Sequence, residues 1–264
     1  EIIHFLDGLV TEGALSYGEI VKSANYCNIP LYSPYICALI SFTEQNRLLQ
    51  TSEWLGTSAL LRSQLADKWE MLSGNISYAF AKYNNVILVL QQSESLPVYE
   101  QVALVREYCG DLMKMLSAKG QDRGVIFGIG DPVPSLAEFC RSYSQALRTV
   151  DLASRICDER IATYRRYILC ELIYDSPNAK LALIQRIKPL LAYDEEHNTQ
   201  LLYTLETYFN NCQNSVKTSK ALFIHRNTLL YRLDRIAEIL DLNYNDSEQM
   251  LTFQLALKAF LMCQ

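Results

Sequence analysis

Polar side chains that can hydrogen-bond to DNA bases recur once per turn in a helix that we predict to begin near residue 226 or 227. They are Asn227, Tyr231 and Arg235, with Thr228 and Arg232 at the edge of the same face. The opposite face is apolar, since leucine and isoleucine recur at i, i+4, i+7 and i+11. Those residues are Leu229, Leu233, Ile236 and Leu240. Such a helix can present polar groups of its N-terminal turn to base edges in the major groove.

A shorter helix is predicted immediately before it. Asn214 and Ser215 are residue types that cap helix N-termini, and small residues such as Ser219 and Ala221 let a second helix cross closely. An apolar turn at residues 223–224 separates the two helices. A short helix, an apolar turn and a polar helix start together favour a helix-turn-helix over an ordinary helical hairpin.

Positive charge is concentrated in the same segment. Residues 214–236 hold five basic residues and one acid, Asp234, a formal charge of +4 in a chain of net charge -5. Charge alone is more typical of an ordinary helical hairpin with a solvated surface, but together with the helix pattern it indicates a DNA-binding site. We predict base contacts from Arg226, Asn227 and Thr228. We predict phosphate contacts from Lys217, Thr218, Lys220, Tyr231, Arg232 and Arg235.

The composition narrows the class of protein. Half of the 264 residues are hydrophobic, which excludes a largely disordered chain, and the net charge of -5 excludes a protein that coats nucleic acid by bulk charge. The longest apolar runs fall far short of the roughly 18 residues of a membrane span. Because the chain starts at Glu1 without an initiator methionine, we expect it to be part of a longer polypeptide.

The cysteines and histidines predict no metal site. The eight cysteines include no CxxC pair, and the three histidines are dispersed along the chain. Most cysteines lie in apolar segments, where a free thiol behaves as a small buried hydrophobe. We therefore expect reduced thiols in a cytoplasmic protein that has no metal, no cofactor and no membrane association.

Upstream of the helical segment, strand-like and helix-like patterns alternate. After two short helices, the predicted order is strand, helix, hairpin, helix, strand, helix, strand, which implies a mixed sheet covered by helices. The hairpin turn is predicted at Asn84 and Asn85, and the last strand at residues 161–173. Turn-forming residues then mark a domain boundary near 174. The predicted parts are an N-terminal helical connector at 1–30, an α/β domain at 31–173 and a helical domain at 174–264.

The run from Asn214 to Leu233, N-x-x-x-T-x-x-x-L-F-I-H-R-N-T-L-L-Y-R-L, resembles the C-terminal helix-turn-helix of the PucR/CdaR transcription regulators. Residues 187–209 are similar to the lead-in of that domain, and residues 31–173 resemble the GGDEF-like domain that precedes it. The resemblance implies an α+β chain, in which a degenerate GGDEF-like α/β sandwich is followed by an all-α helix-turn-helix domain. It also implies a missing N-terminal sensor region.

The resemblance raises the question of enzymatic activity, because true GGDEF domains condense GTP with metal-binding carboxylates. In those enzymes the motif occupies the hairpin turn. Here the turn, residues 82–85, has neither a Gly-Gly pair nor a carboxylate, and the first strand lacks the aspartate of the second metal ligand. We therefore expect no catalytic residues, and a domain that serves as a scaffold for dimerisation or signal relay, or as a ligand site.

Three further features carry weaker signals. The two glycines of residues 128–132, GIGDP, lack the third glycine of a phosphate-binding loop, so a strand-to-helix turn explains them better. The acidic triplet at residues 194–196 is more typical of a solvated, negatively charged helix start than of a catalytic carboxylate pair. His225 either caps or buttresses the second helix, or contacts phosphate.

Together these observations predict a sequence-specific transcription regulator that controls a catabolic or metabolic operon in response to an unknown effector. Its partners would be double-stranded DNA, a second copy of the chain and a small-molecule effector. The alternatives are a divergent nucleotide-binding or cyclase-like enzyme, and a protein-interaction module without DNA binding. The candidate association surfaces are two apolar sets: Leu251, Phe253, Leu255, Leu257, Phe260 and Leu261, and Ile2, Ile3, Leu6, Leu9 and Val10.

Overall fold

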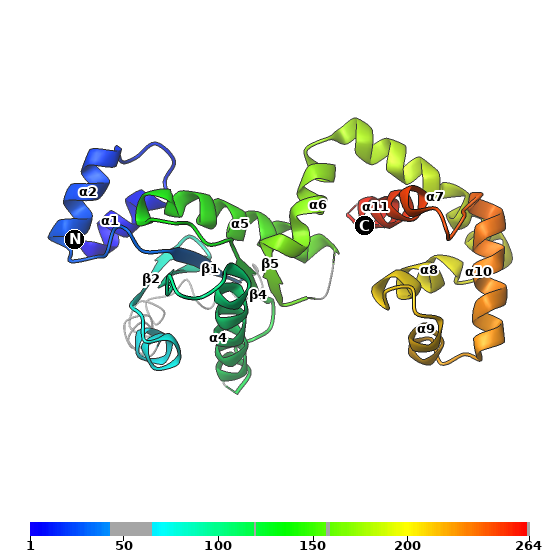
Figure 1. Cartoon of the computed structure of the whole chain (residues 1–264), viewed down its shortest axis with the longest axis horizontal. Helices are drawn as coiled ribbons and strands as arrows, with labels where there is room; N and C mark the ends of the chain where they lie inside the picture. Colours follow the sequence, from blue (N-terminus) through cyan, green and yellow to red (C-terminus); the bar gives the residue numbers. More distant parts are fainter. Residues whose placement is uncertain (43–64, 119, 157–158, 263–264) are drawn as a thin grey trace. The chain divides into compact units, whose positions relative to one another are not determined.

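The computed structural model describes residues 1–42, 65–118, 120–156 and 159–262 (Figure 1). The chain forms two compact units, Glu1–Ile168 and Leu169–Gln264. The division falls inside helix α6 (Tyr164–Tyr174), shortly before the boundary that the turn-forming residues predict near 174.

Among the described residues of the first unit, five strands form one mixed sheet in the order β2-β3-β1-β4-β5. Neighbouring strands are antiparallel except β4 and β5, which are parallel. The strands are β1 (Tyr35–Phe42), β2 (Ser77–Lys82), β3 (Asn85–Gln91), β4 (Val125–Ile129) and β5 (Ile161–Thr163). The sheet confirms the α/β class predicted for this part of the chain.

Helices cover both faces of the sheet (Figure 1). Successive side chains of a strand point to opposite faces, and in β1 Tyr35, Cys37 and Leu39 belong to one apolar core while Ile36 and Ala38 belong to the other. Three helices contribute to the first core: α1 (Ile2–Leu9), α2 (Tyr17–Tyr26) and α5 (Phe139–Ile156). The second core lies under α4 (Val98–Ala118) and the helix of residues 65–73.

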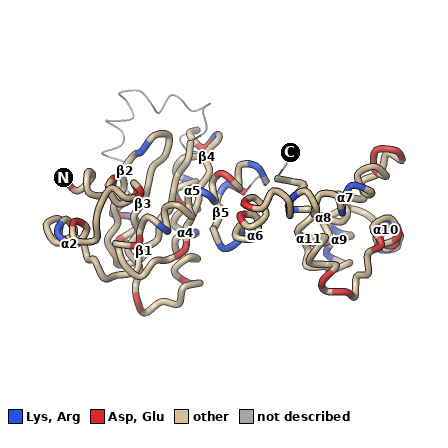
Figure 2. Tube along the Cα trace, turned by 90° about the horizontal axis from the view of Figure 1, so that it is seen from above, with Lys and Arg blue, Asp and Glu red and all other residues tan. Residues whose placement is uncertain are grey.

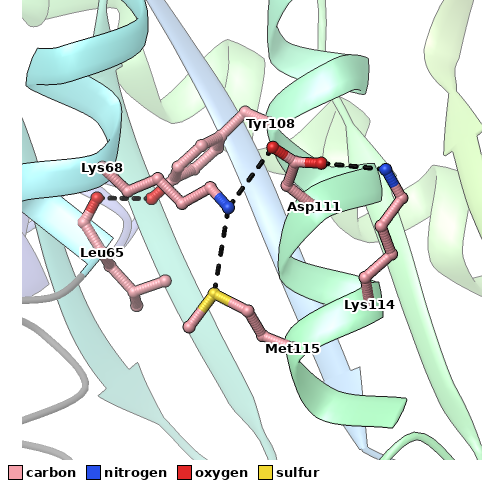
Figure 3. Close-up of polar contacts among 6 residues, drawn as sticks. All are labelled: Leu65, Lys68, Tyr108, Asp111, Lys114 and Met115. Carbon is pink, nitrogen blue, oxygen red and sulfur yellow. Dashed lines mark hydrogen bonds and ion pairs between the residues drawn. The ribbon is translucent and has the colours of Figure 1, made fainter. Parts of the chain in front are cut away.

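Polar contacts fasten the helix of residues 65–73 to α4 (Figure 3). The Tyr108 hydroxyl donates a 2.7 Å hydrogen bond to the carbonyl oxygen of Leu65. One turn along α4, the Asp111 carboxylate pairs with Lys68 at 3.3 Å and with Lys114 at 3.1 Å. The hydrogen bonds from Lys114 and Lys68 lower the pKa of the Asp111 carboxyl. The sequence predicts a helix between the first strand and the hairpin, at residues 58–72, and the part of it before residue 65 lies outside the described residues.

Two glycines let α5 approach the sheet closely. A Cβ atom at Gly128 would clash with the carbonyl oxygen of Ala146, and one at Gly130 would clash with the carbonyl oxygen of Ser142. At this crossing the Ser142 hydroxyl accepts a buried 2.9 Å hydrogen bond from the backbone N–H of Cys37. The GIGDP segment therefore has a packing role, which agrees with the structural explanation for its glycines.

Two predictions in this unit are wrong in detail. The strand predicted at 161–173 ends at Thr163 and continues as helix α6, because its apolar residues serve a helical face: Tyr167, Cys170 and Ile173, three positions apart, are buried. The hairpin loop is one residue earlier than predicted. Asn85 pairs with Lys82 in the strand ladder, and Tyr83 takes the positive φ of 54°.

The first thirty residues form two helices, as predicted, and both helices pack on the sheet. Phe5, Leu6 and Leu9 of α1 and Ile20 of α2 are buried in the first core of the sheet. The Glu19 carboxylate and the Ser16 side chain form a capping box at the start of α2, which satisfies backbone N–H groups there. These residues therefore pack as part of the first unit.

The second unit is all-helical in its described part, as predicted. Its helices are α7 (Pro177–His197), α8 (Leu201–Asn210), α9 (Ser215–Ala221), α10 (Arg226–Leu240) and α11 (Ser247–Leu261). One apolar cluster joins α10 to α8, and a second joins α7 to α11 through Ile187, Ala256 and Leu257. No helix in the described part of either unit is long and apolar enough to cross a membrane.

Candidate nucleic-acid interface

Helix α9 begins at the residue that its sequence indicates. The Asn214 side chain accepts hydrogen bonds of 3.0 Å from the backbone N–H groups of Val216 and Lys217. This N-cap satisfies donors that the first helical turn leaves unpaired. The side chains of Lys217 and Lys220 are exposed on this short helix. Figure 2 colours the basic residues of the chain blue along the trace, those of α9 among them.

The turn between α9 and α10 is fixed by backbone hydrogen bonds. The N–H of Phe223 donates to the carbonyl oxygen of Lys220 at 3.2 Å, and the N–H of Ile224 donates to that of Ser219 at 3.0 Å. These two bonds make up a Schellman motif, with Phe223 in the left-handed region at φ 54°. The direction in which α10 leaves the turn is thereby set by α9.

His225 caps α10. Its Nδ1 accepts a 3.2 Å hydrogen bond from the backbone N–H of Asn227. Of the two roles that the sequence leaves open, capping and phosphate contact, the structure contains the capping role. An imidazole that accepts through Nδ1 carries its proton on Nε2 when it is neutral. The exposed ring of His225 therefore keeps one N–H donor for a second partner.

The apolar face predicted for α10 is buried as expected. All four of its residues lie in the apolar cluster shared with Leu201 and Leu205 of α8, and they are Leu229, Leu233, Ile236 and Leu240. This packing leaves the first two turns of the opposite face toward solvent. Tyr231 on that face is 71 % exposed.

The three residues predicted to contact bases lie together at the start of α10. Arg226, Asn227 and Thr228 are all exposed. Within the part of the chain that the structure describes, their side chains make no hydrogen bond or ion pair, and the same holds for Lys217, Lys220 and Tyr231. These groups are available to an external partner, and their net charge suits an anionic one.

Thr218 and Arg232, two predicted phosphate ligands, are engaged inside the unit. Thr218 has no exposed surface, and its hydroxyl donates a 2.8 Å hydrogen bond to the carbonyl oxygen of Asn214. The polar side chain that suggested a DNA contact instead stabilises the first turn of α9. The guanidinium of Arg232 donates a 3.1 Å hydrogen bond to Thr204 of α8, which is itself buried.

Arg235 lies over α7. Its guanidinium carbon is 4.9 Å from the centroid of the Tyr193 ring, its Nε donates to the Tyr193 hydroxyl at 3.2 Å, and Nη1 pairs with Glu238 at 2.6 Å. The hydrogen bonds with Tyr193 and Glu238 raise the pKa of Arg235. The ring of His197 stacks on Tyr193 with centroids 4.0 Å apart. Arg235 thus connects α10 to α7.

Sequence reasoning missed the positioning roles of Tyr193 and Asp194. The two carboxylate oxygens of Asp194 accept hydrogen bonds of 2.8 Å from the backbone N–H groups of Leu201 and Leu202 at the start of α8. The Thr199 hydroxyl also donates to Asp194. Of the acidic triplet, Glu195 and Glu196 are exposed, whereas Asp194 caps the helix on which α10 packs. The triplet lies in the last turn of α7 and not at a helix start, and no local sequence pattern indicates that Asp194 caps the following helix.

The turn that corresponds to the GGDEF motif holds a lysine bound to α1. Lys82 pairs with Asp7 at 2.9 Å and donates a 2.7 Å hydrogen bond to the Thr11 hydroxyl. Among the residues with described positions, no group of three or more histidine, cysteine or acidic side chains is arranged to hold a metal ion.

Comparison with known proteins finds two family matches. Residues 12–152 match the GGDEF-like domain, and residues 201–259 match the PucR C-terminal helix-turn-helix domain. The first match covers more than half of the chain. It begins inside the predicted N-terminal connector, and it ends before α6.

Three curated relatives are similar to this chain. The proline-responsive transcriptional activator PutR of Bacillus subtilis is 27% identical over 66% of this chain and 43% of its own length. The carbohydrate diacid regulator of Escherichia coli is 30% identical over 49% of this chain and 34% of its own length. The purine catabolism regulatory protein of Bacillus subtilis is 26% identical over 72% of this chain and 37% of its own length. The chain spans less than half of the length of these relatives.

Proposed function

The chain belongs to the PucR-type family of transcription regulators, in which a GGDEF-like domain precedes a C-terminal helix-turn-helix, and on this premise we propose that it regulates transcription by binding duplex DNA through α9 and α10. The family is one of regulators and not of enzymes, and its GGDEF-like domain is degenerate here. In this proposal the chain recognises DNA and catalyses no reaction.

One observation carries the proposal. Arg226, Asn227 and Thr228 lie at the N-terminal turn of α10, and their side chains are exposed and have no partner in the described structure. The rest of the protein holds this helix in place. The His225 cap fixes the start of the helix, and its apolar face is buried against α8. Recognition helices of helix-turn-helix proteins use this turn to contact base edges.

We assign base contacts to Arg226, Asn227 and Thr228, and phosphate contacts to Lys217, Lys220 and Tyr231. Planar arginine and asparagine side chains suit bidentate contacts to guanine and adenine, whereas exposed lysines suit phosphates. Arg232 and Arg235 hold α10 against its neighbours, so the proposal gives them a positioning role. Thr218 is not part of the proposed contact surface because it is buried.

The first unit, in this proposal, is a scaffold for assembly or signal relay in a cytoplasmic regulator of a catabolic or metabolic operon. In the same proposal the chain forms a homodimer and responds to a small-molecule effector. Two features support the non-catalytic role. Lys82 occupies the hairpin position where a cyclase would carry its motif, and β1 contains no acidic residue. The effector is sought by measuring the affinity of the chain for DNA in the presence of candidate metabolites, since an effector should change that affinity.

The DNA-contact assignment is tested with a duplex selected from a random pool by the wild-type chain, and with a scrambled duplex of equal length. Asn227→Ala should lower affinity for the selected duplex by about 1–3 kcal/mol more than for the scrambled one. Lys220→Ala should weaken both to the same extent. Lys188→Ala, the same charge change at an exposed position of α7, is the control and should change neither. Equal losses for Asn227→Ala on both duplexes would contradict the assignment, and absence of salt-dependent DNA binding would favour a protein-interaction module.

A further inference from the structure

Phe223 is a bulky, exposed residue in a backbone conformation that disfavours bulky side chains, and folding of the second unit does not require this combination. Its side chain is 95 % exposed, and its backbone lies in the left-handed region at φ 54°. A bulky side chain is uncommon in that region, since its Cβ meets the neighbouring carbonyl oxygen. The residue therefore adopts an unfavourable backbone conformation without gaining burial for its ring.

The position is one where glycine fits best. Phe223 is the C′ residue of the Schellman motif that ends α9, with its N–H bonded to Lys220 and the next N–H bonded to Ser219. These bonds impose a positive φ on whichever residue stands there, and glycine adopts it without steric cost. Packing at the turn comes from Leu222 and Ile224, which lie against the core of the second unit. Folding stability thus gives no reason for a phenylalanine at this position.

The neighbours of Phe223 in the sequence are basic, and two of them belong to the proposed DNA site. Lys220 precedes it on α9, and His225 and Arg226 follow it at the start of α10, all three exposed. The sequence has no acidic residue between Asn214 and Leu233. A partner that suits an apolar ring among basic residues combines negative charge with an exposed apolar group. Duplex DNA offers both in the major groove, where the 5-methyl group of thymine lies beside the phosphates.

We propose that the Phe223 ring contacts the 5-methyl group of a thymine that adjoins the bases read by Arg226 and Asn227. This inference rests on the proposed function and adds a specificity-determining residue to it. The contact would explain why the chain keeps an exposed ring at a position suited to glycine. It also makes thymine distinguishable from cytosine and from uracil at one place in the site.

The test uses deoxyuridine, which differs from thymidine only by the missing methyl group. Each thymine of the duplex selected by the wild-type chain is replaced singly, and affinity is measured for the wild type, Phe223→Gly and Phe223→Leu. We expect one position at which uracil weakens wild-type binding about fourfold, as burial of one methyl group would give. Phe223→Gly should bind thymine and uracil equally there, and Phe223→Leu should retain part of the preference.

Thermal unfolding of the same variants separates recognition from folding. Phe223→Gly should unfold at the same temperature as the wild type or higher, because glycine removes the strain at φ 54°. A wild type that binds its selected duplex but ignores every uracil substitution would overturn the proposal, as would a Phe223→Gly variant that keeps the wild-type preference. A wild type that prefers no duplex over scrambled DNA would refute the proposed function itself.

Discussion

The guanidinium of Arg235 in α10 lies over the ring of Tyr193 in α7, 4.9 Å from its centroid, and donates a hydrogen bond to the hydroxyl of that ring. The two residues are far apart in the sequence, and their contact holds the middle of the proposed recognition helix. A cation over an aromatic face is attracted by the ring quadrupole. An arginine that the sequence assigns to phosphate therefore has a partner inside the protein.

Arg235→Ala and Lys217→Ala should differ in how they affect DNA binding. Lys217→Ala should reduce the slope of log affinity against log salt by about 1, because one phosphate contact is lost. Arg235→Ala should lower the thermal midpoint of unfolding and weaken binding while leaving that slope nearly unchanged. Salt titrations and thermal melts of both variants check this prediction. A reduced slope in Arg235→Ala, with the unfolding midpoint of the wild type, would indicate that Arg235 contacts a phosphate instead.

Asp194 should stabilise the start of α8. Asp194→Ala removes the acceptor of two backbone N–H groups and should cost about 1–2 kcal/mol in the free energy of unfolding of the second unit. Amide hydrogen exchange at Leu201 and Leu202 should accelerate in this variant. The neighbouring exposed residue gives the control, Glu195→Ala, which should leave both amides as they are in the wild type. Unchanged exchange in Asp194→Ala would show that the cap is not formed in solution.

Gly130→Ala should destabilise the first unit by about 1–3 kcal/mol, because the new methyl group would overlap the carbonyl oxygen of Ser142. Gly110→Ala is the matched control: a Cβ there meets no atom within 4 Å, and Gly110 lies inside α4. That exchange should stabilise the unit by about 0.5–1 kcal/mol, since alanine is the better helix former. Urea unfolding of the two variants checks the opposite signs, and equal effects would contradict the close approach of α5.

The sequence was sufficient for features that depend on local periodicity. The apolar face of α10 follows from apolar residues at helical spacing, and the first strand follows from a run of β-branched and aromatic residues, so both could be predicted. The segment 161–173 was misassigned because its β-branched and aromatic residues favour a strand. Tyr167, Cys170 and Ile173 are buried at helical spacing, which favours the helix α6 over a strand. That burial depends on tertiary packing, which the local sequence does not show.

The hydrogen-bond partners of individual side chains could not be predicted in the same way. Whether Thr218 faces solvent or the first turn of α9 depends on a hydrogen bond to Asn214, and the residue type permits either. Arg232 and Arg235 carry the charge expected of phosphate ligands, but their partners, Thr204 and Tyr193, come from other helices. Arg226, Asn227 and Thr228 have no partner inside the described structure, so their exposure could be predicted from the helix pattern alone.

The first unit should neither make nor hydrolyse a cyclic dinucleotide. Its hairpin turn presents Lys82, which is paired with Asp7, where a metal-binding carboxylate would be required. Incubation with GTP and Mg²⁺ or Mn²⁺, followed by chromatography, should show no product above a protein-free control. Turnover that disappears on Lys82→Ala or on another substitution in this unit would overturn the prediction.

The protein should bind its specific site as a dimer, because one reading head is small. Asn227 and Tyr231 lie one turn apart on a helix of 15 residues, so one copy contacts few base pairs. Two copies related by a twofold axis would read half-sites about 34–36 Å apart, or a multiple of that distance, and their binding energies would combine.

The association surface should lie outside α10, and the structure narrows the two apolar candidates. Phe253 and Leu257 of α11 are buried within the second unit, while Leu251 is exposed; Leu6 and Leu9 of α1 are likewise buried, while Ile3 is exposed. Sedimentation of the wild type, Leu251→Glu and Ile3→Glu, with and without the selected duplex, tests both surfaces. We expect two 30.2 kDa protomers per duplex for the wild type, and a lower stoichiometry or affinity for the variant whose surface associates. A single wild-type protomer per site at saturating protein would refute the dimer, because no second half-site would then be read.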